Sequence, residues 1–124
     1  MALIIIADDD ELIRSVLREA LVRCGHVVIE ASNGVDCLRL MKSEAPELII
    51  IDIFMPELDG LGTLNEVSEK WPEVKVICMS GGGSHNSLDY LDVAKEFGAY
   101  QVLKKPFKIK HVINIVSDIL ALPV

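Results

Sequence analysis

Four consecutive aliphatic residues at positions 48–51 run directly into the acid Asp52, and Pro56 follows four residues later. An uninterrupted apolar run of this length is typical of a strand buried on both faces, as in a parallel sheet. We therefore predict a strand over residues 47–52. Asp52 then lies at the carboxyl end of a buried strand, where open α/β sheets place their ligand sites. Aspartate is also a common turn residue, so the rest of the chain must decide its role.

Four further segments have the apolar character of strands, and a helical pattern follows each expected strand. The strands are expected at residues 2–7, 26–30, 47–52, 74–80 and 100–104, and the helices at about 9–23, 34–43, 61–70, 86–97 and 107–120. This alternation is typical of a parallel sheet covered on both faces. Right-handed crossovers leave few topologies, and we expect the flavodoxin-like doubly wound α/β fold with strand order 2-1-3-4-5. Residues 1–124 are expected to form one domain, without an output domain.

The helical segments carry signals for their ends and for their buried faces. Ser32 is a candidate cap for the second helix, and Pro106 fits the start of the last helix. Gly60 belongs to a turn signal and can adopt a positive φ. The residues expected to face inward recur at helical spacing: Leu12, Ile13, Val16, Leu17, Ala20 and Leu21 in the first helix, and Val35, Leu38 and Met41 in the second.

Composition narrows the possible classes of protein. The net charge of -7 argues against non-specific binding of nucleic acid. No apolar run approaches the ~20 residues that cross a bilayer, and no signal peptide precedes the first strand. Three cysteines without a CxxC spacing lie within or beside apolar segments, which indicates reduced and mostly buried thiols. We therefore expect a cytoplasmic protein without membrane contact.

Chemically active side chains follow four of the five expected strands. Asp8 and Asp9 come after the first strand, Asp52 ends the third, Ser80 ends the fourth and Lys105 follows the fifth. In a parallel sheet these strand ends meet at one edge, and adjacent strands are only ~4.8 Å apart. The sequence therefore predicts that three acids, a hydroxyl and an ammonium group converge there.

Such a cluster has a definite chemistry. Carboxylates held close together repel one another, and a hard divalent cation such as Mg²⁺ relieves the repulsion. A carboxylate between a metal ion and an ammonium group can act as a nucleophile toward phosphorus. The Ser80 hydroxyl and the N–H groups that follow it, beginning with Gly81, can donate to phosphoryl oxygens.

Each of these residues also has an ordinary structural role open to it. The acids at 8–10 suit the start of a helix, Ser80 can cap a turn, and most lysines such as Lys105 are simply solvated. These ordinary roles do not explain why every member falls at the correct strand end. The joint pattern favours a functional site.

Together these motifs resemble the receiver domain of two-component response regulators, in the stand-alone form of the chemotaxis regulators. The resemblance spans the chain and is carried by residues 6–10, 51–56, 59–60, Ser80 and 105–107. It implies a phosphorelay protein that accepts a phosphoryl group from a histidine kinase or a histidine phosphotransfer protein. It also implies that the chain is not an enzyme acting on other substrates, and that it only phosphorylates itself and slowly dephosphorylates itself.

The resemblance assigns a role to each residue of the cluster. Asp52 would be the phospho-acceptor. Asp9, Asp52 and the backbone carbonyl of Phe54 would bind Mg²⁺ directly, Asp8 would act through water, and Mn²⁺ could replace Mg²⁺.

The other members would act on the phosphoryl group. Lys105 would bind it, and the Gly81 N–H would donate to its oxygens. Ser80 would be the switch hydroxyl that moves toward it and carries the fourth strand and the following helix along.

The chain departs from the usual receiver pattern in two respects. Many receivers carry Tyr or Phe three residues before the lysine, but Val102 stands there and the aromatic residue is Tyr100. The usual coupling of an aromatic side chain to the switch hydroxyl is therefore not expected. Phe54 and Gly82 flank the route of an attacking water, so the lifetime of the phosphoryl group should differ from that in other members.

The signal is expected to leave by contact with an unknown downstream protein through residues 86–120. This region carries acids on one helix and basic residues at the start of the next: Asp89, Asp92 and Glu96, then Lys108 and Lys110. A solvated face would explain these charges equally well. Ile115 broadens the apolar face of the last helix, which favours a partner or dimer contact. We expect a monomer or a weak dimer.

Two other functions are compatible with parts of the pattern. A pseudo-receiver would bind its partner without being phosphorylated. A haloacid-dehalogenase-type phosphatase would use Asp8 as its nucleophile, but Leu12 replaces the Thr or Val of that motif. The acidic pair expected after the lysine is also missing, since only Asp118 follows it, and Asp52 would have no role.

Overall fold

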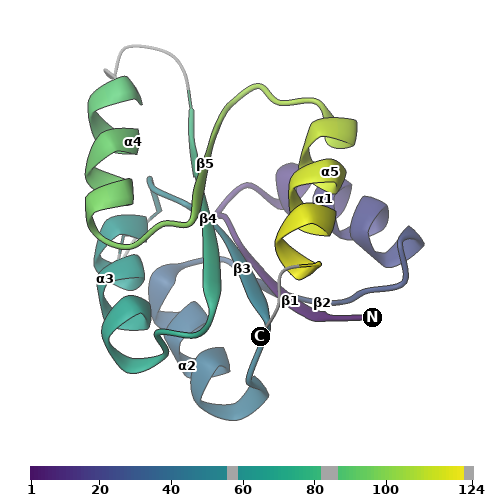
Figure 1. Cartoon of the computed structure of the whole chain (residues 1–124), viewed down its shortest axis with the longest axis horizontal. Coiled ribbons are helices and arrows are strands. Elements are labelled where there is room, and N and C mark those ends of the chain that lie inside the picture. The colour runs from purple at the N-terminus through teal and green to yellow at the C-terminus, as the bar shows by residue number, and fades with distance from the viewer. Residues whose placement is uncertain (56–58, 82–86, 122–124) are drawn as a thin grey trace.

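Five parallel strands form one sheet in this computed structural model, which describes residues 1–55, 59–81 and 87–121 (Figure 1). The strands are β1 (Leu3–Ala7), β2 (Val27–Ala31), β3 (Leu48–Asp52), β4 (Lys75–Ser80) and β5 (Gln101–Lys104). Their order across the sheet is β2-β1-β3-β4-β5. The predicted flavodoxin-like topology is therefore confirmed.

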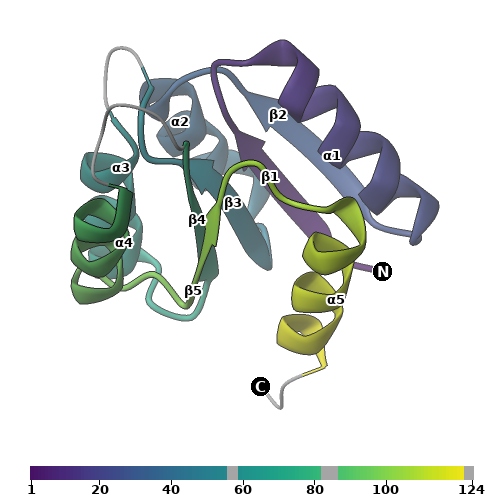
Figure 2. The same ribbon diagram turned by 90° about the horizontal axis from the view of Figure 1, so that it is seen from above.

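Helices cover both faces of this sheet (Figure 2). They are α1 (Glu11–Arg23), α2 (Gly34–Glu44), α3 (Gly60–Lys70), α4 (Ser87–Glu96) and α5 (Ile109–Leu120). α1 and α5 lie on one face, and α2, α3 and α4 lie on the other. Because both faces are covered, every residue of β3 is buried, as its continuous apolar run predicts.

Two apolar cores result from the alternation of side chains along the strands. Ile49 and Ile51 of β3 belong to the core beneath α2, α3 and α4. Leu48 and Ile50 belong to the core beneath α1 and α5. The central strands are thereby held from both sides, which gives the residues at their carboxyl ends a rigid base.

The starts of α1 and α5 and the cap of α2 differ from the sequence-based expectation. α1 begins at Glu11, because the Asp10 side chain accepts from the Leu12 N–H and caps the helix. Asn33, and not Ser32, caps α2 by accepting from the Asp36 N–H. α5 begins at Ile109, so Pro106 lies three residues before the helix, in a cis peptide bond with Lys105.

Several side chains expected to face inward are exposed instead. Leu12, Val16 and Val35 are 71%, 42% and 44% exposed, whereas Leu17 and Leu21 are buried. A helix that lies on a sheet buries only a narrow stripe, so apolar residues beside that stripe remain in water.

α5 and the cysteines also differ from expectation. Ile115 is buried in the core with Val116, so the broad apolar face of α5 serves the sheet and does not by itself indicate a dimer contact. Cys37 and Cys78 are buried as expected, but Cys24 is exposed.

Among the described residues, no helix has the length and apolar character needed to cross a membrane.

Some expectations fall on residues that the structure does not describe. They concern Pro56, Gly82 and the predicted start of the fourth helix at residue 86.

Candidate functional site

Three acids and one lysine come together at the carboxyl edge of the sheet. Asp8, Asp9 and Asp52 each offer a carboxylate oxygen, and these oxygens lie within 4.8 Å of one another. The Lys105 ammonium donates to Asp8 Oδ2 at 2.9 Å and to Asp52 Oδ2 at 3.3 Å. The expected convergence of these four side chains is therefore present.

Strand register explains why the acids meet. Ala7 of β1 pairs with Ile51 of β3, so the next residues, Asp8 and Asp52, emerge side by side. Lys105 follows β5, and its backbone N–H donates to the Ser80 carbonyl of β4 at 2.8 Å. From there its long side chain reaches back to the acids.

The acids differ in their exposure to solvent. Asp8 and Asp52 are 0% and 5% exposed, whereas Asp9 is exposed. Burial and the neighbouring Asp8 carboxylate raise the pKa of Asp52 to about 6, and Lys105 and the Phe54 N–H oppose this shift. Burial acts to lower the pKa of Lys105, but its hydrogen bond to Asp8 and the nearby charges of both acids hold that pKa above its usual value. The lysine therefore stays charged and partly neutralises the acids.

The donor set fits a hard divalent cation. Carboxylate oxygens are the ligands that Mg²⁺ and Mn²⁺ prefer, and one exposed acid beside two buried ones leaves room for water ligands. The Phe54 N–H donates to Asp52 Oδ1 at 3.4 Å, which places this residue beside the carboxylate. Its carbonyl as a metal ligand stays a prediction.

Ser80 lies at the expected strand end but is not bonded to the acids in the described part of the chain. Its side chain is fully buried, and its hydroxyl donates to the Gly81 carbonyl at 3.4 Å. Space around Gly81 is open, since an added Cβ would meet nothing within 4 Å. Packing therefore does not require a glycine there, and the roles of Ser80 and Gly81 toward a phosphoryl group stay predictions.

Gly60 has a role in this site that sequence reasoning missed. Its N–H donates to the Ile53 carbonyl at 2.8 Å, and an added Cβ would overlap the Asp52 carbonyl oxygen. Gly60 does not use the positive φ that a glycine can adopt, because the described glycines with positive φ are Gly25 and Gly98. Gly60 is needed for close approach, which lets α3 begin directly against the backbone of Asp52. No signal in a single sequence distinguishes these two uses of glycine.

The structure places Tyr100 at the far end of β5 from the acids. Its N–H donates to the Val76 carbonyl near the start of β4, whereas Ser80 pairs with Lys104. The Lys75 ammonium lies 5.1 Å from the centroid of its ring. Tyr100 thus contacts the opposite end of the neighbouring strand, which agrees with the expected absence of the usual aromatic–hydroxyl coupling.

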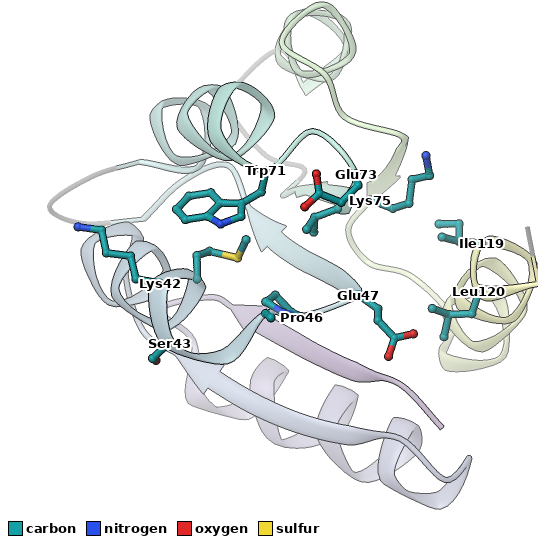
Figure 3. A pocket seen from close by; sticks show the side chains of 12 residues that line it. Lys42, Ser43, Pro46, Glu47, Trp71, Glu73, Lys75, Ile119 and Leu120 are labelled. Carbon is teal, nitrogen blue, oxygen red and sulfur yellow. The ribbon is translucent and has the colours of Figure 1, made fainter. Parts of the chain in front are cut away.

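A hollow of about 650 Å³ lies at this opposite, amino-end edge of the sheet (Figure 3). Pro46 and Glu47 border it just before β3, Trp71 and Glu73 border it before β4, and Leu120 closes it from α5. Because it adjoins the amino ends of β3 and β4, it is separated from the acids by the length of the strands. It takes no part in the site described above.

Comparison with known proteins identifies the family that shares this arrangement. The family described as "Response regulator receiver domain" matches residues 4–117. The DNA-binding transcriptional regulator NtrC of Azospirillum brasilense is 36% identical over 116 residues, which cover 94% of this chain and 24% of that protein. NtrC of Escherichia coli K12 is 35% identical over 112 residues, covering 90% of this chain and 23% of the relative. The chain thus spans about a quarter of the length of these curated relatives.

Solved structures agree with the sequence comparison. The receiver domain of NtrX from Brucella abortus superimposes with a TM-score of 0.89 at 30% identity, covering 97% of this chain and 99% of that one. A response regulator receiver domain protein from Clostridium thermocellum gives a TM-score of 0.89 at 27% identity, covering 97% and 94%.

Proposed function

The chain belongs to the response regulator receiver domain family, and on this basis we propose that Asp52 accepts a phosphoryl group from a histidine of a kinase or of a phosphotransfer protein. One observation carries the proposal. The buried Asp52 carboxylate has an oxygen within 4.8 Å of carboxylate oxygens of Asp8 and Asp9, and the Lys105 ammonium contacts it at 3.3 Å. A carboxylate so placed can act as a nucleophile toward phosphorus.

The chemical step needs Asp52 in its ionised form. Its pKa of about 6 leaves most of the carboxylate ionised at neutral pH. An Asp52 oxygen attacks the phosphorus, the P–N bond of the phosphohistidine breaks, and its electron pair leaves with the imidazole. Asp9, Asp52 and the Phe54 carbonyl would hold Mg²⁺ directly, and Asp8 would hold it through water. The bound ion would supply positive charge that offsets the charge of the phosphoryl oxygens.

Lys105 changes its partner during this step. Before transfer its ammonium is shared between Asp8 and Asp52. Transfer removes the negative charge from the Asp52 carboxyl group and brings the phosphoryl oxygens in, so the ammonium is free to bind one of them. The Ser80 hydroxyl and the Gly81 N–H would donate to the others.

The domain would act in the cytoplasm and would turn over only its own phosphoryl group. Its output would be a contact with a downstream protein through residues 86–120, without nucleic acid binding by this domain itself. NtrC proteins are DNA-binding transcriptional regulators of about four times this length, so a larger assembly of that kind is a natural setting for the domain.

Intact-mass measurement after incubation with acetyl phosphate tests the proposal. Wild-type protein should gain the mass of one phosphoryl group with Mg²⁺, and this gain should be lost without Mg²⁺ and in Asp52→Asn. Asp59→Asn is the matched control, since the Asp59 side chain caps α3 by accepting from the Gly62 N–H, is not one of the clustered acids, and asparagine can cap equally well. Labelling that persists in Asp52→Asn would overturn the assignment. Wild-type protein that takes no label with Mg²⁺ would favour the phosphorylation-independent pseudo-receiver.

A further inference from the structure

Arg14 links the first helix to the loop that carries two of the acids. Its Nη1 donates to the backbone carbonyl of Asp8 at 2.7 Å, and its Nε donates to Glu30 Oε1 at 3.0 Å. The Arg14 side chain is only 16% exposed, and that of Glu30 is 26% exposed. The guanidinium group is therefore largely enclosed between the end of β2 and the end of β1.

We propose that Arg14 is a positioning residue that holds the loop at residues 8–10 in the geometry that binds Mg²⁺, and that Glu30 holds Arg14 in turn. This inference rests on the metal site proposed above.

The contact acts directly on the peptide unit that sets Asp9. The Asp8 carbonyl belongs to the peptide plane joining Asp8 to Asp9, so a bond to it fixes the orientation of that plane. The peptide units before and after this plane are held by other hydrogen bonds. The Asp8 N–H donates to the Ala31 carbonyl at 3.1 Å, and the Asp10 N–H donates to Asp8 Oδ1 at 2.9 Å. The carbonyl bond to Arg14 completes this framework, and without it the plane can rotate and move the exposed Asp9 carboxylate.

The charges around the loop make such a support necessary. Asp8, Asp9 and Asp52 repel one another, and this repulsion pushes the exposed Asp9 carboxylate away from the two buried ones. A guanidinium group donates in a rigid planar fork, so it can bind the carbonyl and Glu30 at the same time. The other Glu30 oxygen, Oε2, accepts a hydrogen bond from Arg18 Nη1 at 2.9 Å, which further orients the carboxylate.

If Arg14 acted on Mg²⁺ affinity only through its charge, its removal would change that affinity in the opposite direction from the loss of a positioning residue. Arg14 carries a positive charge near a proposed cation site, so removing it should strengthen Mg²⁺ binding if only the charge mattered. If Arg14 positions the loop, removing it should weaken Mg²⁺ binding, by roughly tenfold as for other groups that orient metal ligands. The sign of the change therefore separates the two explanations.

Arg18→Gln supplies a matched control. Arg18 pairs with the same Glu30 carboxylate, but within the described part of the chain its side chain donates to Glu30 and not to the acid loop. Arg14→Gln and Arg18→Gln both remove one arginine from one ion-pair cluster on one helix. Both variants lose one positive charge and one partner of Glu30, so weakening that follows only from loss of this ion-pair cluster should appear in both.

Calorimetric titration with Mg²⁺ at neutral pH, on variants whose folding is checked by circular dichroism, tests the inference. We expect Arg14→Gln to raise the Kd for Mg²⁺ roughly tenfold and Arg18→Gln to change it less than about twofold. Arg14→Lys keeps the positive charge but loses the planar guanidinium group, so it should also weaken Mg²⁺ binding. This variant replaces Arg14→Gln if Arg14→Gln does not fold. The double variant Arg14→Gln/Glu30→Gln should bind no more weakly than Arg14→Gln alone, because Glu30 acts through Arg14.

The possible failures are distinguishable. If the wild-type protein does not bind Mg²⁺, the proposed metal site is wrong and this inference falls with it. If the wild-type protein binds Mg²⁺ and Arg14→Gln and Arg14→Lys bind it equally well or more tightly, the metal site stands and the positioning role is overturned. Equal weakening by Arg18→Gln would also overturn it.

Discussion

At the scale of single residues, the charge on Asp52 works against the stability of the metal-free domain. Burial and Asp8 raise the pKa of this group from 3.8 to about 6. Between these two pH values the native state binds more protons than the unfolded state, so stability falls as pH rises through this window. Two pKa units correspond to a loss on the order of 2–3 kcal/mol that persists at neutral pH.

Asp52→Asn should therefore stabilise the domain in the absence of metal. At pH 7 with a chelator, we expect urea denaturation to show a free energy of unfolding about 2 kcal/mol above that of the wild type, with the difference shrinking toward pH 4. The pH series supplies its own control, since both proteins are measured at each point. A variant no more stable than wild type at pH 7 would contradict the raised pKa of Asp52.

At the scale of elements, the start of α3 depends on the absence of a side chain at Gly60. A Cβ there would overlap the backbone of Asp52. Gly60→Ala must push α3 away from β3, and overpacking of this kind costs about 1–3 kcal/mol. The shift should also move Asp52, so phosphoryl labelling should slow together with the loss of stability.

Gly81→Ala is the control for stability, because its added Cβ would meet nothing within 4 Å. We expect urea denaturation to show a clear loss for Gly60→Ala and little change for Gly81→Ala. Equal stability of the two variants would mean that α3 adjusts to the added methyl group without cost.

The helix starts show which element properties can be read from sequence. The existence and order of all five helices follow from periodic apolar residues, and the structure confirms them. The caps do not follow, because Ser32 and Asn33 are both good capping residues and only the path of the chain decides between them. For the same reason Leu12 and Val16 match the helical period but lie beside the buried stripe.

At the scale of the whole molecule, Mg²⁺ should stabilise the folded state. The three acids are brought together only by folding, since Asp8 and Asp9 follow β1 and Asp52 ends β3, so the ion should bind the native state far better than the unfolded chain. A ligand at ten times its Kd adds about 1.4 kcal/mol to the free energy of unfolding. We expect Mg²⁺ to raise the thermal unfolding temperature of the wild type in proportion to the logarithm of its concentration.

Two controls separate this effect from general screening by salt. NaCl at matched ionic strength should produce a smaller shift, and Asp9→Asn should reduce the Mg²⁺ shift, since Asp9 is exposed and its substitution leaves both cores intact. An equal rise with NaCl would contradict specific binding at the cluster.

The sequence by itself determined the strands, their parallel arrangement and the edge at which Asp8, Asp52 and Lys105 meet. These properties depend on local patterns: apolar runs mark the strands, and parallel strands bring their carboxyl ends to one edge. Only the tertiary structure decided that Gly60 must lie against the Asp52 backbone and that Arg14 and Glu30 reach the peptide between Asp8 and Asp9. These contacts join different elements. They cannot be predicted from the sequence, because a local pattern of apolar residues does not indicate which distant backbone group a side chain will contact.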